Sequence, residues 1–310
     1  MTYNLIKQRL ENNDIIILDG AIGAELEKKG AKMHKDLWCG TCSVENPNLV
    51  QKVHEEYILA GADIITTNTY ATTPIAMKQY GFGDQVYEFN KKSVQIAKEA
   101  VKNTKKDTTI AGSVSTFGSL YKFGTKAMIP GFKEQLKILS GEGVDLIILE
   151  AMSSQADIVG TIIECSIETK LPVWLSISCV MDDVNNKVML GYNDTIDSDT
   201  NIYEDFETSI SNFSQSHNGP ILIAHSDINV TGRAIKIANK KFSGVLGAYP
   251  NRGYYEKPNW KFIDDISPNE YLQYARSWKK DGAQIIGGCC GVGIDEIKAI
   301  SILKKDKNAE

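Results

Sequence analysis

Short apolar runs recur along the chain, and each is followed by small or polar residues and then by a stretch with helical spacing. Runs that are continuous rather than alternating, and rich in Ile and Val, are typical of parallel strands buried on both faces. Eight such runs span residues 15–21, 63–70, 108–114, 145–151, 172–178, 220–226, 242–249 and 283–290. The pattern therefore predicts eight buried parallel strands.

The stretches between the runs carry an amphipathic helical pattern, which is clearest over residues 49–60. Leu49, Val53 and Tyr57 share one stripe there, and Gly61 follows as a helix stop. Further helices are predicted over residues 84–101, 132–139, 156–167, 230–239, 269–280 and 294–303. Eight strands alternating with helices predict an α/β fold, a (β/α)8 TIM barrel, as a single domain over residues 1–310. A doubly wound open sheet is the structural alternative.

Composition and charge narrow the class of protein. With 42% hydrophobic and 24% charged residues, the chain is that of an ordinary globular protein. Its net charge is −5 without a Lys/Arg cluster, so no nucleic-acid partner is expected. No apolar run is long enough to span a membrane, and the charged N-terminus lacks a signal-peptide pattern. We expect a cytoplasmic protein without a membrane partner, and the sequence leaves its oligomeric state open.

The ends of the predicted strands carry polar and metal-ligating residues. Active sites of this barrel fold lie at the C-terminal ends of the strands. One polar ending would mean little, but eight that converge on one ring indicate a site. The residues at these ends are Asp19, Gly20, Asn68, Thr69, Tyr70, Ser113, Glu150, Ser176, Ser178, His225, Ser226, Tyr249, Asn251, Cys289 and Cys290.

Residues 286–291 read IGGCCG and place two cysteines side by side at the end of the eighth run. The other four cysteines are scattered without a disulfide spacing, which is typical of cytosolic chains, whose close cysteine pairs more often bind metal or do chemistry. Two buried core cysteines are the alternative. Successive strand side chains point to opposite faces, so both thiolates reach one ion only if Gly287, Gly288 and Gly291 let the strand break.

A third metal ligand would have to come from another strand end. His225 closes an apolar run, whereas the other three histidines lie in a loop, on a helix and in a polar stretch. Two thiolates and one imidazole would hold Zn²⁺ with a fourth position open, as in catalytic zinc sites. We therefore predict zinc as the cofactor and His225, Cys289 and Cys290 as its ligands. A hydrogen-bonded core histidine is the alternative for His225.

Several stretches resemble the homocysteine S-methyltransferase family over nearly the whole length of the chain. They are LDGAIGAELEKKG, LWCGTCSVENPNLVQKVHEEYILAGADIITTNTYATT, AGSV, GVDLIILEA, VWLSISC, YPNRG and IGGCCG. ENPNLV with GADIITTNTY is specific, and IGGCCG is more so. The resemblance implies a zinc barrel enzyme that moves a methyl group from a sulfonium or ammonium donor to homocysteine, giving methionine. S-methylmethionine and glycine betaine are donors of this kind.

The predicted site agrees with this chemistry, because zinc deprotonates a bound thiol and the thiolate is the nucleophile. By resemblance, the carboxylates of Asp19 and Glu150 hold the amino-acid head of homocysteine. Trp38, Tyr70 and Tyr249 could present aromatic faces to a cationic donor. The predicted substrate-binding residues are Asp19, Gly20, Trp38, Asn68, Tyr70, Glu150, Ser178, Tyr249 and Asn251. Helix caps for the carboxylates and core packing for the aromatics are the alternatives.

The chain departs from the family pattern at several positions. The sixth strand of the family usually ends in Asn-Cys, with that Cys a zinc ligand, whereas Ala224 and His225 stand here. A Cys₂His site carries one less negative charge than Cys₃, so it should bind zinc less tightly. Ala24 stands where Thr is common, and Tyr254 where an acidic residue is common. A barrel acting on another thiol or by hydrolysis, and a barrel that has lost zinc, therefore stay as alternatives.

The loops after the first, third, fifth and seventh predicted strands are long and rich in Gly and aromatic residues, and they are predicted to roof the metal end and to become ordered when substrate binds. Residues 117–131 (FGSLYKFGTKAMIPG) read as a mobile cover, and residues 182–190 as a small hairpin around Asn185 and Asn186. A cobalamin-dependent methionine synthase is not expected, because the chain ends soon after the eighth unit.

Overall fold

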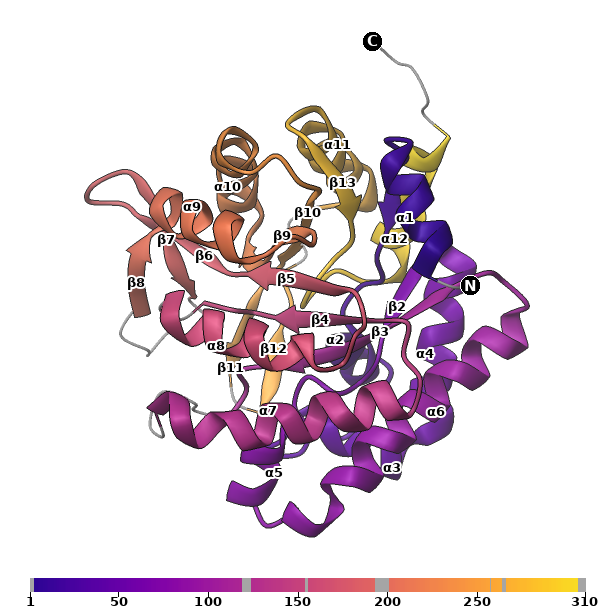
Figure 1. Ribbon diagram of the computed structural model, residues 1–310. Helices are drawn as coiled ribbons and strands as arrows, with labels where there is room; N and C mark the ends of the chain where they lie inside the picture. The colour runs from indigo at the N-terminus through magenta and orange to yellow at the C-terminus, as the bar shows by residue number, and fades with distance from the viewer. Residues whose placement is uncertain are drawn as a thin grey trace.

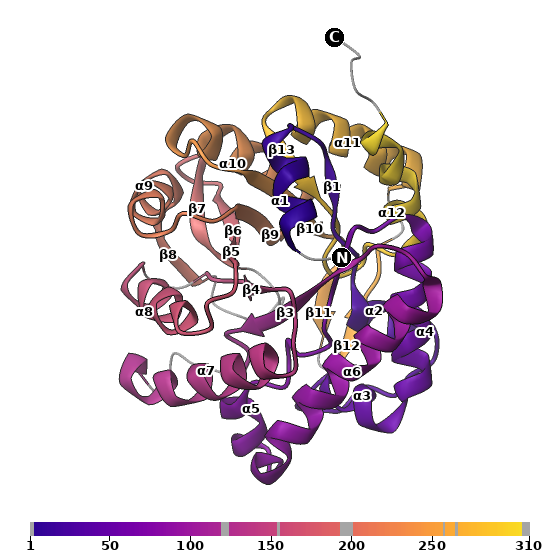
Figure 2. The same cartoon turned by 45° about the vertical axis from the view of Figure 1, so that its right-hand side comes forward.

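Eight parallel strands follow one another in chain order around a barrel (Figure 1, Figure 2). The computed structural model describes residues 3–118, 124–153, 156–192, 201–256, 258–263 and 266–305. The barrel strands are β1 (Ile16–Ile17), β2 (Ile64–Thr66), β3 (Thr109–Ser115), β4 (Leu146–Glu150), β5 (Val173–Ile177), β9 (Ile221–Asp227), β10 (Leu246–Asn251) and β13 (Ala283–Ile286). Leu18 pairs in parallel with Ile64, which joins β1 to β2. The predicted TIM barrel is confirmed, and the open sheet is excluded.

Helices surround the strands, as Figure 2 shows. The helices are α1 (Tyr3–Glu11), α2 (Ile22–Lys28), α3 (Cys42–Glu45), α4 (Pro47–Ala60), α5 (Pro74–Gln79), α6 (Val86–Thr104), α7 (Gly124–Gly141), α8 (Ala156–Ile167), α9 (Phe206–Ser216), α10 (Ile228–Lys241), α11 (Pro268–Lys280) and α12 (Ile294–Ile300), with the 3-10 turns η1 (Cys39–Thr41), η2 (Gly83–Gln85) and η4 (Ser301–Lys304). The predicted helix over residues 156–167 coincides with α8. The loop predicted over residues 117–131 is wrong from residue 124 onward, because α7 begins at Gly124 and continues through Pro130. The role of this segment as a roof over the metal end stays a prediction. Residues 119–123 of that cover lie outside the described residues.

Two small antiparallel sheets extend from the C-terminal ends of barrel strands. One contains β6 (Cys179–Asp182), β7 (Lys187–Tyr192) and β8 (Asn201–Asp205), and the other β11 (Tyr254–Glu256) and β12 (Asn259–Lys261). Asp182 pairs with Lys187 across the turn between β6 and β7, so the predicted hairpin is confirmed. Its ordering by substrate stays a prediction.

The hydrophobic core has two layers, one inside the barrel and one between the barrel and the helices. Ile6 and Leu10 of α1 pack with the inner layer, so α1 covers one end of the barrel. Each fully buried Leu or Ile side chain contributes about 1.5–3 kcal/mol. This packing leaves the opposite, C-terminal end of the strands for the polar residues.

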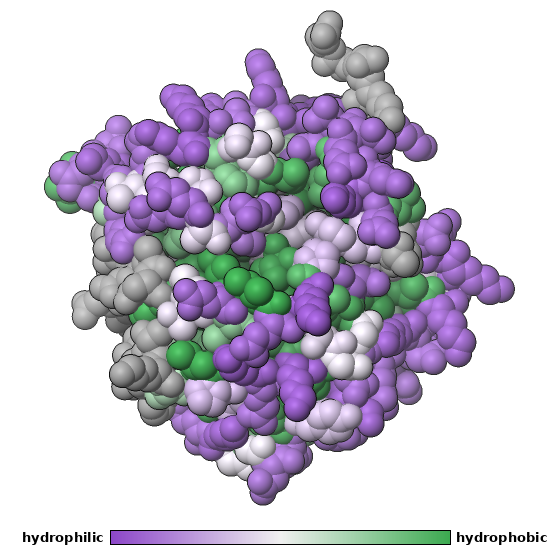
Figure 3. Space-filling model, in the orientation of Figure 1, coloured by the Kyte–Doolittle hydropathy of each residue, from purple (hydrophilic) through white to green (hydrophobic). Residues whose placement is uncertain are grey.

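On the face that Figure 3 shows, most of the surface is hydrophilic, and hydrophobic residues lie toward the middle. Across the described residues, no helix combines the length and the hydropathy that crossing a membrane requires.

Candidate metal centre and substrate pocket

A cavity at the C-terminal end of the barrel gathers most of the residues predicted from the strand ends. Its lining includes Asp19, Gly20, Trp38, Asn68, Tyr70, Ser113, Glu150, His225, Tyr249, Cys289 and Cys290. Two predicted substrate residues lie elsewhere. Ser178 is buried outside this cavity, and Asn251 lines a neighbouring cavity that shares His225 with it.

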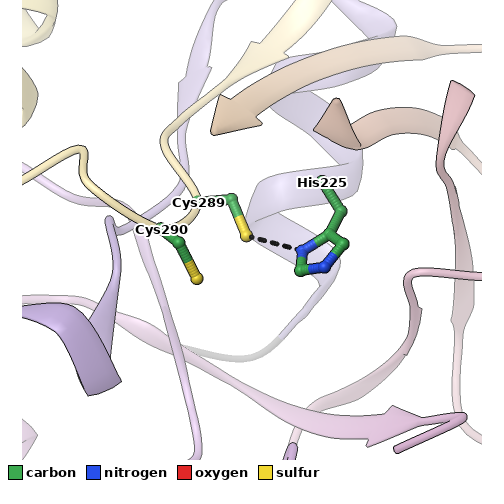
Figure 4. A group of neighbouring side chains, drawn as sticks. All are labelled: His225, Cys289 and Cys290. Carbon is green, nitrogen blue, oxygen red and sulfur yellow. Dashed lines mark hydrogen bonds between the residues drawn. The ribbon is translucent and has the colours of Figure 1, made fainter. Parts of the chain in front are cut away.

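One imidazole and two thiols meet at the wall of this cavity (Figure 4). Ligand atoms of His225, Cys289 and Cys290 all lie within 4.8 Å of one another. Cys289 Sγ is 3.6 Å from His225 Nδ1. Sulfur and nitrogen ligands on a tetrahedral Zn²⁺ lie about 3.6 Å apart, given bond lengths near 2.3 and 2.0–2.1 Å. The geometry and the chemistry of these donors therefore fit such an ion.

The surroundings of the Cys289 thiol favour its deprotonated form. Hydrogen bonding with Cys290 and the nearby His225 lower the pKa of Cys289 to about 5, although burial opposes the shift. Metal binding requires the thiolate form, so this environment favours a metal ligand over an inert core cysteine.

The two neighbouring thiols reach one point because the chain leaves β13 in an unusual path. Gly291 takes φ +80°, as the predicted break requires. Gly287 and Gly288 are required by close packing and not by a positive φ. A Cβ at these positions would lie 2.7 Å from Leu18 Cβ and 2.1 Å from Val292 Cγ1, respectively. The glycines thus permit close packing as well as a turn.

His225 faces the cavity because β9 has an extra residue at this point. Leu222 and Ala224 belong to the inner barrel core, so simple alternation would turn His225 outward. The register against β10 shifts between Ala224 and Asp227, and His225 takes φ +51°. Ser226 Oγ donates to Ala224 O at 2.7 Å within this kink. A bulge of this kind re-aims a side chain, and a left-handed non-glycine residue is common at functional sites.

Asp19 lies deep in the cavity, beyond the end of β1. Its carboxylate accepts from the backbone N–H of Thr66 at 2.7 Å and from the Thr66 hydroxyl. Burial raises the pKa of Asp19 well above its usual range, and the charge of Glu150 adds to the rise. The Thr66 contacts, which the sequence reading missed, hold the carboxylate in place without neutralising it.

Glu150 ends β4 and lines the same cavity. Tyr249 OH donates to Glu150 Oε2 at 3.2 Å. Burial and then the charge of Cys289 raise the pKa of Glu150 to about 7, while Ser113 and Tyr249 oppose the rise by hydrogen bonding. Among the described residues, neither Asp19 nor Glu150 has a Lys or Arg partner. Two buried carboxylates of this kind suit the ammonium group of a small ligand.

Aromatic rings cover the cavity from the side of β2. Tyr70 lies 6.1 Å from the His225 ring and 5.8 Å from the Phe117 ring, measured between centroids. Trp38 precedes η1 with φ +45° and is buried. Cys39, which the sequence reading did not select, lines the cavity and donates its thiol to Asn68 Oδ1 at 3.3 Å. Its position beside the cavity depends on the fold of η1, for which strand ends give no signal.

Comparison with known proteins identifies the family. The model described as Homocysteine S-methyltransferase matches residues 16–303, nearly the whole chain. The chain belongs to the homocysteine S-methyltransferase family. The predicted family and the predicted enzyme class, a methyltransferase, are therefore confirmed.

Curated relatives of this family match along most of their length. Homocysteine S-methyltransferase 2 of Zea mays is 28% identical, and the match covers 95% of this chain and 91% of that protein. The selenocysteine methyltransferase of Astragalus bisulcatus is 26% identical, with 92% and 90% covered. The metallated form of the homocysteine methyltransferase MmuM from Escherichia coli has a TM-score of 0.74 at 22% identity, covering 96% of this chain and 98% of that one. The last comparison shows the shared barrel fold.

Proposed function

We propose that this protein transfers a methyl group from a sulfonium or ammonium donor, of the S-methylmethionine type, to the thiol of homocysteine, giving methionine. Zinc would be held by His225, Cys289 and Cys290. The carrying observation is that these three side chains share one cavity with two buried carboxylates that have no Lys or Arg partner among the described residues. The family supports the acceptor, and the MmuM structure described as metallated supports the metal.

Zinc, when bound, would keep the acceptor thiol ionised and nucleophilic at neutral pH. Asp19 and Glu150 would bind the acceptor's ammonium group and thereby orient its sulfur toward the donor. Trp38 and Tyr70 would face the positive charge of the donor. The C–S bond of the product forms as the bond from the methyl carbon to the donor's sulfur or nitrogen breaks. The departing thioether or amine is neutral, so no residue has to protonate it.

The test concerns His225, because the neutral imidazole stands where the family usually has a thiolate. Metal content after purification should be about one zinc per wild-type chain and clearly less in His225→Ala, whereas His225→Cys should restore or tighten binding. Methylation of homocysteine by S-methylmethionine should follow the zinc content across the three proteins. Full zinc retention in His225→Ala would contradict the ligand assignment.

A second acceptor is favoured by the relatives named selenocysteine methyltransferases. Selenocysteine offers the same ammonium and carboxylate groups on a shorter chain, with a selenol that ionises readily. Parallel assays with homocysteine, cysteine and selenocysteine, at one donor concentration, would rank the acceptors by kcat/KM. A higher kcat/KM for selenocysteine would move the proposed acceptor while leaving the site assignment in place.

A further inference from the structure

The turn that carries Cys289 and Cys290 is held at two points by two residues, Arg252 and Glu296, whose side chains form a buried ion pair. The backbone N–H of Arg252 donates to Cys290 O at 2.7 Å. At the end of the turn, Glu296 Oε2 accepts from the backbone N–H of Gly293 at 2.9 Å. Arg252 Nη1 donates to Glu296 Oε1, also at 2.9 Å, and this contact links the two holding points into a ring.

Other contacts of Arg252 make this ring rigid. The side chains of Arg252 and Glu296 are only 5% and 12% exposed. Arg252 Nη2 donates to Ile263 O at 3.1 Å, and Arg252 O accepts from Trp260 Nε1 at 2.8 Å. The turn also presses against this residue, because a Cβ on Gly291 would lie 1.8 Å from Arg252 O. The guanidinium is therefore committed to the protein and is not presented to a ligand.

We propose that Arg252 and Glu296 are positioning residues for the metal site, and this inference rests on the proposed function. Their ion pair fixes residues 290–293, so that the two thiols keep their spacing from His225. A Cys₂His set has one less charge than Cys₃, so it depends more on having its ligands held in place before the metal arrives. Residues that orient metal ligands contribute about 10–100-fold to metal affinity.

Glu296→Gln tests the ion pair with little change of shape. Glutamine keeps an acceptor for the Gly293 N–H, as in a capping box, but it loses the charge that faces Arg252. Zinc affinity, measured by competition with a chromophoric chelator, should fall about 10–100-fold. Arg252→Lys, which keeps the charge but not the fork of donors, should shift the affinity in the same direction. Both variants are measured at a temperature at which circular dichroism shows them folded.

Asp63→Asn is the matched control, because Arg9 and Asp63 form a comparable pair at the other end of the barrel, 2.7 Å apart. It should lower the melting temperature without changing the zinc affinity. An unchanged affinity in Glu296→Gln would overturn the proposal. So would an equal loss of affinity in Asp63→Asn, because the effect would then be a general loosening of the barrel.

A readout without metal separates this inference from the proposed function. In metal-free protein, Cys290 should be alkylated by iodoacetamide faster in Glu296→Gln than in the wild type, as followed by peptide mass spectrometry. Cys165, a buried cysteine on α8, should keep its wild-type rate. If the wild type binds no zinc, the proposed function fails, but the alkylation rates still report on the turn. Equal rates for Cys290 in the two proteins would contradict its fixing by the ion pair.

Discussion

Each end of the barrel has a buried aspartate, and the two aspartates differ in their partners. At the N-terminal end, Asp63 accepts from Arg9 at 2.7 Å and from Lys304 at 3.2 Å. At the C-terminal end, Asp19 accepts from the N–H and hydroxyl of Thr66, and no Lys or Arg of the described chain pairs with it. Asp63 is 7% exposed and Asp19 2%, so burial does not explain the difference.

The difference separates stability from function. The buried carboxylate of Asp63 ties α1 and η4 to the start of β2, and its charge is paired with Arg9 and Lys304 within the protein. A buried carboxylate that has only hydrogen bonds is costly in the free protein, and a cationic ligand offsets that cost on binding. Similar substitutions at the two ends should therefore change the stability of the protein in opposite directions, and only those at the C-terminal end should weaken ligand binding.

Asp63→Ala should have the largest effect on stability. It leaves Arg9 and Lys304 without their buried counter-charge and removes the acceptor of the Ile17 N–H, which lies 2.9 Å from Asp63 Oδ2. The free energy of unfolding should fall by about 3–5 kcal/mol, as measured by urea denaturation. Asp84→Ala, at an exposed position, serves as the control. A loss below about 1 kcal/mol for Asp63→Ala would mean that the N-terminal cluster is a surface feature.

His54 offers an intermediate effect, in a group whose burial outweighs the opposing charge of the neighbouring Glu55. It is fully buried on α4, and neither ring nitrogen has a hydrogen-bond partner within the described part of the chain. Burial lowers the pKa of His54 from 6.5 to about 4. Below pH 6.5 His54 is protonated in the unfolded chain, whereas in the folded protein it stays neutral until about pH 4. The free energy of unfolding should therefore fall by about 1.4 kcal/mol per pH unit in this window, about 3 kcal/mol in all.

His54→Leu removes this titration and is the comparison to make. Urea denaturation at pH 8, 6, 5 and 4 should show a smaller acid loss in His54→Leu than in the wild type. At pH 8 the two proteins should differ little, because the imidazole is neutral in both states. Parallel pH curves for the two proteins would mean that water reaches the His54 ring.

Most strands and helices of the barrel are predictable from the sequence, because buried parallel strands and amphipathic helices have strong local patterns. Helix α9 was missed although Phe206, Ile210 and Phe213 are buried at helical spacing, because its serines resemble a loop. The predicted start of helix α7 lies too late in the chain, because Pro130 ordinarily breaks a helix. In both cases tertiary packing outweighs the local preference of a few residues.

The sequence predicts which residues of the site lie at strand ends, but it does not predict which way their side chains point. Tyr249 and Asn251 are two residues apart and should share a face, yet the register of β10 shifts between them and only Tyr249 lines the cavity. The same irregularity brings His225 into the cavity against simple alternation. Bulges depend on hydrogen bonds between strands that are far apart in the sequence, such as the bond from Cys179 N–H to Ser226 Oγ at 2.8 Å. Sequence periodicity therefore does not predict them.

Asp19→Asn should have the smallest effect on stability, and its sign distinguishes the two ends most sharply. Asparagine keeps an acceptor for the Thr66 N–H but removes a carboxylate whose pKa burial raises well above its usual range. The free energy of unfolding at pH 7 should rise by about 0.5–2 kcal/mol, the range common for stabilising substitutions, because the cost of burying the carboxylate is removed. The kcat/KM for homocysteine should fall about 10–100-fold, because a hydrogen bond to a charged group contributes about 1.5–3 kcal/mol. Asp63→Asn, measured beside it, should lose stability and leave the KM for homocysteine unchanged. If Asp19→Asn also loses stability, then Asp19 is a structural anchor like Asp63, and the acceptor's ammonium group must be sought at Glu150 alone.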